Sequence, residues 1–284
     1  MEPEKSALIV MNWAMKFLPM WYREDMSKFF GKRGLPWHIT VATMKTLDGK
    51  YKTRTIVYNF DQCTQDSAAV LAILQDSLKR LKTKVPTLES VYLRADNAGC
   101  YHSAQTLLSL PVIAAEVGIC IKRFDFSDPP GGKADCDRMA ATIKRHVHLF
   151  VAEKHDCTTG QEFADAIESH GEIVGVSIHY GSLQENDNAI QAKNPKIKGI
   201  SALNNFEYTS DNRVVAWKAY NIGQGVLIQE APGAYHNHKF VESYRTTRHI
   251  TWRHLGSEVA DLQPESYEGN EICSSSGMTS RDGD

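Results

Sequence analysis

Residues 91–99 read Val91-Tyr92-Leu93-Arg94-Ala95-Asp96-Asn97-Ala98-Gly99, an apolar run that ends in a carboxylate and a glycine-containing loop. In α/β proteins, functional side chains gather where buried strands end, because the carboxyl ends of parallel strands line a shared crevice. Asp96 is therefore the first candidate functional residue. The alternative is that Asp96 starts a turn or caps the helix that follows.

Upstream of this stretch, the sequence predicts a β-hairpin. Residues 37–44 alternate large or β-branched side chains, and residues 52–58 repeat that pattern. Between them, Asp48-Gly49 is the dipeptide that favours a tight hairpin turn. An earlier apolar run at residues 7–11 is short, and its periodicity fits a buried strand or a buried helix.

Around and after Asp96, helical and strand patterns alternate. Apolar residues in the range 66–82 recur at three- and four-residue steps, which predicts an amphipathic helix. Residues 103–117 predict a second helix that Pro111 should kink or shorten. A strand is expected at 119–126 and a long helix at 134–151.

The C-terminal part differs in composition. The sequence predicts short strands at 174–180, 213–220 and 225–228, separated by polar loops. Residues 257–284 are polar and poor in aliphatic side chains, which predicts a disordered tail. We therefore divide the chain into a core (1–171), a small β-rich extension (172–256) and this tail.

Three antiparallel strands followed by strand–helix–strand crossovers predict a mixed α/β sheet with helices on its faces. Over about residues 7–155, this order resembles the ribonuclease-H-like fold of DDE-type transposases and retroviral integrases. Three local patterns carry the resemblance: Met11-Asn12-Trp13-Ala14, Ala95-Asp96-Asn97-Ala98-Gly99 and Gly132-Lys133-Ala134-Asp135-Cys136-Asp137-Arg138. The resemblance implies a five-stranded mixed sheet flanked by helices.

The resemblance also implies a metal site and a reaction. In that family, acidic side chains from the first strand, the fourth strand and the helix after the fifth converge on two divalent ions. Carried over, these positions are Asn12, Asp96 and Asp137, with Asp135 as the alternative to Asp137. The expected cofactor is Mg²⁺ or Mn²⁺, because hard cations take oxygen ligands and two such ions stabilise both oxygens of an in-line displacement.

Asn12 departs from the family pattern. An amide oxygen can coordinate a cation, but it carries no negative charge and bridges two ions poorly. Metals should therefore be held more weakly than by three carboxylates. Asn12 also has a structural alternative, in which its side chain is hydrogen-bonded to nearby backbone. The structural alternative for Asp135 and Asp137 is that they complement the dipole at the start of their helix.

Basic residues near these positions are candidates for contacts with the phosphates of DNA. They are Lys133, Arg138, Lys144 and Arg145. A solvated helix face explains Lys133 and Arg138 equally well, and it is the default interpretation for Lys144 and Arg145. His102, just after Asp96, is a candidate for transferring a proton or orienting a phosphate. The alternative is a structural histidine whose ring is hydrogen-bonded within the turn. The pair His236 and His238 has the spacing of two metal ligands, but no third ligand lies near in sequence.

Composition limits the classes of function. The 284 residues are 42% hydrophobic and 23% charged with a formal net charge of −2, so contact with a polyanion must come from local basic patches. The six cysteines form no Cys-x-x-Cys pair. The N-terminal apolar run is too short to span a membrane, and we expect a nuclear or cytoplasmic protein that is not secreted.

Together these features predict a transposase-derived domain that cuts or joins DNA strands, with a possible homo-oligomeric state. Because of Asn12, an alternative is a domesticated, non-catalytic module that binds DNA or protein. A third reading is an exonuclease or RNA-cleaving enzyme of the same fold, since recognition of a 2′-hydroxyl leaves no trace in a sequence.

Overall fold

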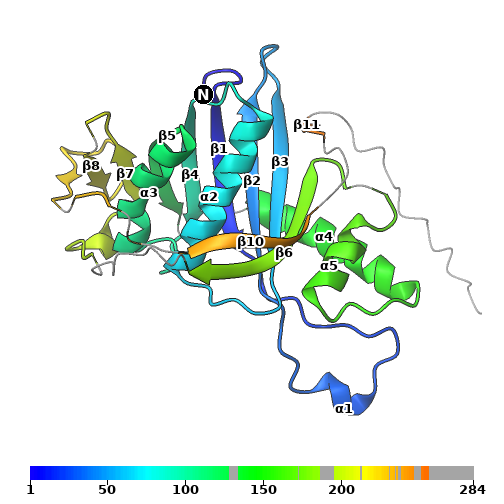
Figure 1. Ribbon diagram of the computed structural model, residues 1–284. Helices are drawn as coiled ribbons and strands as arrows, with labels where there is room; N and C mark the ends of the chain where they lie inside the picture. Colours follow the sequence, from blue (N-terminus) through cyan, green and yellow to red (C-terminus); the bar gives the residue numbers. More distant parts are fainter. Residues whose placement is uncertain are drawn as a thin grey trace, which may run out of the picture.

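The computed structural model describes residues 1–127, 134–171, 173–185, 195–211, 213–229, 231–233, 235, 238–245 and 251–255. Its centre is one mixed sheet of eleven strands with helices on both faces (Figure 1). Along the sheet the strands follow the order β10-β6-β3-β2-β1-β4-β5-β7-β8-β9, and β11 pairs with β3. In the described part of the chain, no helix is long and apolar enough to cross a bilayer.

Five central strands have the connectivity that the sequence predicts. They are β1 (Ser6–Trp13), β2 (Trp37–Lys45), β3 (Tyr51–Asn59), β4 (Ser90–Asp96) and β5 (Cys120–Ser127). Strand β2 is antiparallel to β1 and β3, β4 is parallel to β1, and β5 is parallel to β4. The predicted hairpin is confirmed, and Gly49 takes a φ of 83° at its turn, a conformation that glycine adopts without steric cost.

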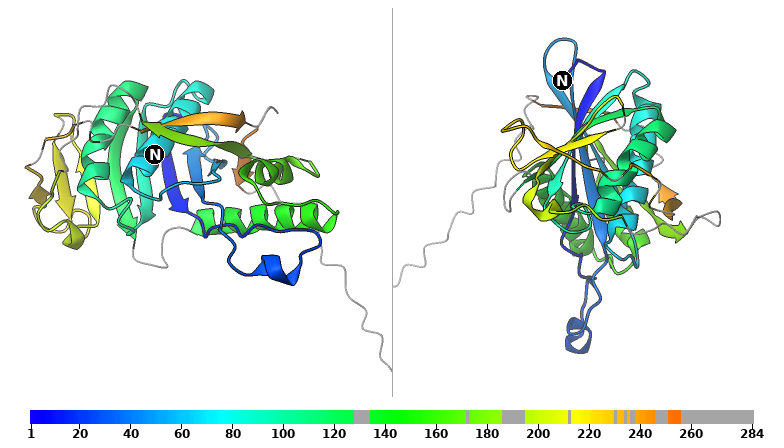
Figure 2. Two further views of the ribbon diagram at one scale, coloured as in Figure 1. Left: turned by 60° about the horizontal axis from the view of Figure 1, so that its bottom comes forward. Right: turned by 90° about the vertical axis from the view of Figure 1, so that its left-hand side faces the viewer.

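Two helices cover each face of the sheet. One face carries α2 (Ser67–Lys84) and α3 (Ala104–Val117), and the other carries α4 (Ala134–Ala152) and α5 (Gly160–Glu168) (Figure 2). Alternate residues of β1 supply the two cores, because side chains of a strand point to opposite faces. Ile9 and Met11 pack under α2 and α3, whereas Val10 packs under α4.

Pro111 lies inside α3, yet the helix continues to Val117. A proline lacks the N–H that would bond the carbonyl four residues earlier, here that of Leu107. The Tyr208 hydroxyl donates to this carbonyl at 3.0 Å, which replaces the missing partner. Of the two expected effects of Pro111, a kink or a shorter helix, the shorter helix is wrong, and the reason lies in a strand that is remote in sequence.

The strands after residue 171 widen the central sheet, because they add strands beside β3 and beside β5. They are β6 (Val176–Glu185), β7 (Asn205–Tyr208), β8 (Val214–Trp217), β9 (Val226–Leu227), β10 (His238–Arg245) and β11 (Arg253–Leu255); the helical turn η1 (Ile200–Ala202) precedes β7. Strands β6 and β11 pair with β3, and β7 pairs with β5. The expected five-stranded sheet is thus too small, because strands of the extension satisfy the backbone groups that β3 and β5 would otherwise leave unpaired. The expected tail, residues 257–284, lies outside the described residues.

The connection between β1 and β2, residues 14–36, extends away from the sheet and has the short helix α1 (Met26–Phe29) at its tip (Figures 1 and 2). Two isolated bridges tie its base, one between Phe17 and Leu35 and one between Met20 and Cys157. The base of this connection lies at the end of the sheet where β1 ends and β2 begins.

Candidate functional site at the carboxyl ends of the strands

The strands β1, β3, β4, β5 and β6 all run in one direction, so their carboxyl ends meet at one edge of the sheet. Asn12 lies near the end of β1, and Asp96 is the last residue of β4. The ladder between these neighbours ends at the pair Val10 and Arg94, so Asn12 and Asp96 each follow two residues later. The two residues therefore lie at the same edge, on adjacent strands.

Asn12 and Asp96 also share a face of the sheet. Met11 and Ala95 pack into the core under α2 and α3, so by strand alternation their successors point to the α4 face. The first turn of α4 lies over this region, since the Cys136 thiol is 3.5 Å from the Val10 carbonyl and 3.8 Å from that of Ile39.

The three side chains of the expected metal set differ in environment. Asn12 is 6% exposed, whereas Asp137 is exposed on the first turn of α4. Asp96 Oδ1 accepts from the Ala98 N–H at 3.2 Å, so the residue forms the turn that was the alternative reading. The helix after it, α3, is capped by Ser103 instead. Asp135, the alternative to Asp137, pairs with Arg138 at 2.5 Å.

Oxygen donors at this edge suit a hard cation by type. Asp96 and Asp137 offer carboxylates and Asn12 offers an amide, which leaves the set one negative charge short of three acids. Among the described residues, no group of three or more His, Cys, Asp and Glu side chains is arranged to hold a metal ion. Restoring an acid at residue 12 is therefore the direct way to test this set.

The basic candidates have different outcomes. Arg138 and Arg145 are both exposed, two turns apart on α4, and Lys144 is half-buried. Arg138 is engaged with Asp135. Lys133 lies outside the described residues.

The histidine candidates are also placed differently. His102 packs against Phe126 with ring centroids 4.4 Å apart, and burial lowers its pKa. That environment fits the structural reading. His236 lies outside the described residues, so the expected pair with His238 is not described.

Next to this edge, buried polar groups gather on the opposite face of the sheet. Trp13 Nε1, His38 Nε2 and the Tyr101 hydroxyl have no hydrogen-bond partner within the part of the chain that the structure describes. The Trp13 and His38 rings are 5.0 Å apart, and those of His38 and Tyr101 are 6.1 Å apart. Burial lowers the pKa of His38 to about 3, so its imidazole is neutral at pH 7.

The buried state of His38 predicts acid sensitivity. The folded pKa lies below the ordinary value of 6.5, so stability is complete above pH 6.5 and falls as the pH decreases toward 3. Between pH 7 and pH 5 this residue should remove about 2 kcal/mol from the free energy of unfolding. The variant His38→Gln should lose that part of the pH dependence in urea unfolding, whereas His148→Gln, on the exposed face of α4, should keep it. Parallel pH profiles for His38→Gln and the parent would contradict the assignment.

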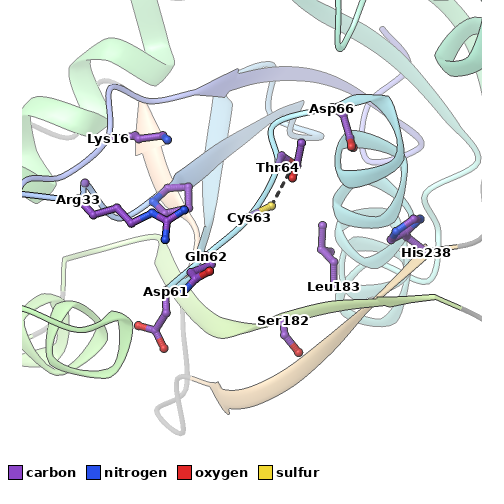
Figure 3. Close-up of a pocket in the computed structure, with 12 residues that line it drawn as sticks. Lys16, Arg33, Asp61, Gln62, Cys63, Thr64, Asp66, Ser182, Leu183 and His238 are labelled. Atoms are coloured by element: carbon purple, nitrogen blue, oxygen red, sulfur yellow. Dashed lines mark hydrogen bonds between the residues drawn. The ribbon is translucent and has the colours of Figure 1, made fainter.

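A pocket opens at the same edge, on the side of α2 and β10 (Figure 3). Its volume is about 370 Å³. Lys16 and Arg33 come from the connection between β1 and β2, and residues 61–66 form the loop between β3 and α2. Ser182 and Leu183 of β6 and His238 of β10 complete it. The sequence offers no single motif for this pocket, because its walls come from four separate segments.

A family model described as a domain of unknown function, DUF8701, matches residues 2–219. The chain belongs to the DUF8701 family. The match begins before β1 and continues beyond β8, so it includes strands on both sides of the central five. A search of curated proteins found no match to this chain.

Proposed function

We propose that this DUF8701 chain has a ribonuclease-H-like core of the transposase and integrase type and that its function is to process DNA strands. The observation that carries the proposal is that Asn12 and Asp96 lie close to one another in the sheet. They lie at one edge and on one face of a sheet ordered β3-β2-β1-β4-β5, with the first turn of α4 over β1.

In this proposal Asp96 and Asp137 supply carboxylates and Asn12 supplies an amide oxygen to Mg²⁺ or Mn²⁺. When bound, a pair of such ions stabilises negative charge on the attacking and leaving oxygens of a phosphodiester. The exposed Arg145 and the other basic residues of α4 hold the DNA backbone beside the carboxylates. Because Asn12 brings no charge, strand cleavage by the chain as it stands is weak.

The test is nicking of supercoiled DNA in Mn²⁺. Asp96→Asn keeps an oxygen that can accept from the Ala98 N–H but removes the charge, so it should retain the thermal midpoint and reduce nicking to the level seen without protein. Asp211→Ala, in the loop between β7 and β8, is the control and should nick like the parent. Equal nicking by Asp96→Asn and the parent would show that Asp96 is not a metal ligand.

The buried amide at residue 12 favours a second candidate function, a domesticated module that binds DNA or protein without cutting. The two candidates differ in two measurable properties, DNA binding without a divalent ion and nicking. A module without catalysis binds DNA equally well in EDTA and in Mn²⁺, and its parent chain shows no nicking in either condition.

A further inference from the structure

The pocket at the strand ends is lined by two carboxylates and two cations, which differ in whether they are bonded to the protein (Figure 3). Asp61 accepts from the Gly160 N–H at 2.7 Å and from the Tyr180 hydroxyl at 2.5 Å. Asp66 caps α2 by accepting from the Ala69 N–H at 2.9 Å. Both carboxylates of the pocket are therefore used to hold helix starts and a neighbouring strand.

Lys16 and Arg33 are exposed cations, and neither forms an ion pair with any residue that the structure describes. Figure 3 shows both entering from one side of the pocket, with Leu183 and His238 across from them. The carboxylates of Asp61 and Asp66 already accept hydrogen bonds from the protein, so the charged groups of the pocket that are free to donate to a ligand are those of Lys16 and Arg33. Such a wall suits a phosphate, which accepts hydrogen bonds from lysine and arginine side chains.

The opposite wall offers a different chemistry. Leu183 provides an apolar surface, and Gln62, Thr64 and Ser182 provide hydrogen-bond donors and acceptors. The Nδ1 atom of His238 is buried and has no partner within the described chain. Burial raises the pKa of the Cys63 thiol to about 12, so this group is a neutral part of the wall rather than a nucleophile.

We propose that this pocket binds one nucleotide of single-stranded DNA, with the phosphate at Lys16 and Arg33 and the base against Leu183. The volume of about 370 Å³ falls in the range of ~300–1,000 Å³ typical of small-molecule sites. A single splayed nucleotide combines the charge, the flat apolar faces and the polar edges that these two walls match. The inference rests on the proposed function, because it names single-stranded DNA as the substrate that lies along the edge carrying Asn12 and Asp96.

The test is fluorescence anisotropy of a labelled single-stranded oligodeoxynucleotide in EDTA, which removes any contribution from divalent ions. The double variant Lys16→Gln/Arg33→Gln should bind about tenfold more weakly at low salt. The slope of log affinity against log salt should decrease by about 0.7 for each phosphate contact that is lost. Lys50→Gln/Lys84→Gln removes the same charge at the opposite end of the sheet, and it should bind like the parent.

An additional variant and a competition experiment complete the test. Leu183→Ala, which removes the apolar wall without changing the charge, should also weaken binding, and thermal melting of each variant checks that the fold is retained. Unchanged affinity in Lys16→Gln/Arg33→Gln, equal losses in the control pair, or tighter binding of duplex than of single strand would each overturn the proposal. Competition by dAMP indicates that a free nucleotide suffices, and failure to compete indicates that the linked strand is needed; both outcomes support the same nucleotide chemistry.

The two proposals fail in distinguishable ways. If the pocket variants lose affinity in EDTA while no variant nicks DNA, the nucleotide site stands and the strand-cutting function does not. If Asp96→Asn abolishes nicking while the pocket variants bind normally, the cutting function stands and the nucleotide site does not.

Discussion

The variant Asn12→Asp is expected to bind Mg²⁺ or Mn²⁺ at least about tenfold more tightly than the parent, a gain of about 1.4 kcal/mol. The substitution hardly changes the size of the side chain and adds the one charge that the set with Asp96 and Asp137 lacks. Nicking of supercoiled DNA should rise with it. Calorimetry with each cation and the nicking assay measure the two effects.

Stability gives an independent readout of the same variant. Residue 12 is 6% exposed, and a buried charge without a partner is costly. In EDTA the thermal midpoint of Asn12→Asp should therefore lie below that of the parent, and a divalent cation should raise it because the cation binds only the folded state.

The chain offers a matched control in Asn59. This residue is also buried near the carboxyl end of a strand, β3, where its Nδ2 donates to the Gly160 carbonyl at 2.5 Å. Asn59→Asp should lose stability without any recovery in Mg²⁺ or Mn²⁺. If Asn12→Asp behaves in the same way, with no recovery and no nicking, the three candidate ligands do not assemble into a metal site.

Local patterns in the sequence predicted most of the central sheet. The Asp48-Gly49 turn and the alternation on either side of it predicted the hairpin, and the apolar stripe predicted α2. The edge position of Asp96 followed from its place after an apolar run. These features depend on neighbours in sequence, which is why they can be read directly.

Contacts between segments that are remote in sequence left no comparable pattern in the sequence. The strand β10 was not predicted, although it pairs with β6 and places Glu242 beside His179. The continuity of α3 through Pro111 depends on Tyr208, nearly a hundred positions later. The pocket at the strand ends could not be predicted for the same reason, since Lys16, Arg33 and His238 are brought together only by the sheet.

The variant Arg80→Met is expected to lower the free energy of unfolding by about 2–3 kcal/mol, because it leaves partly buried carboxylates without their cation. Arg80 bonds Asp76 at 2.5 Å and Glu242 at 3.1 Å, and so connects α2 to β10. Asp76 also accepts from the buried Tyr58 hydroxyl at 2.7 Å, and Glu242 is 2.6 Å from His179 Nδ1. Urea unfolding of the variant and the parent measures the loss.

Lys79→Met is the control for this prediction, since Lys79 is an exposed cation next to Arg80 on α2 and its removal should cost less than about 0.5 kcal/mol. The defect of Arg80→Met should also depend on pH. The pKa of His179 is lowered, with burial as the largest cause and the charge of Arg80 as a further one. Without Arg80 the imidazole protonates more readily and can pair with Glu242, so the difference from the parent should be smaller at pH 6 than at pH 8. A loss no greater than that of Lys79→Met at both pH values would mean that the network does not hold β10 against α2.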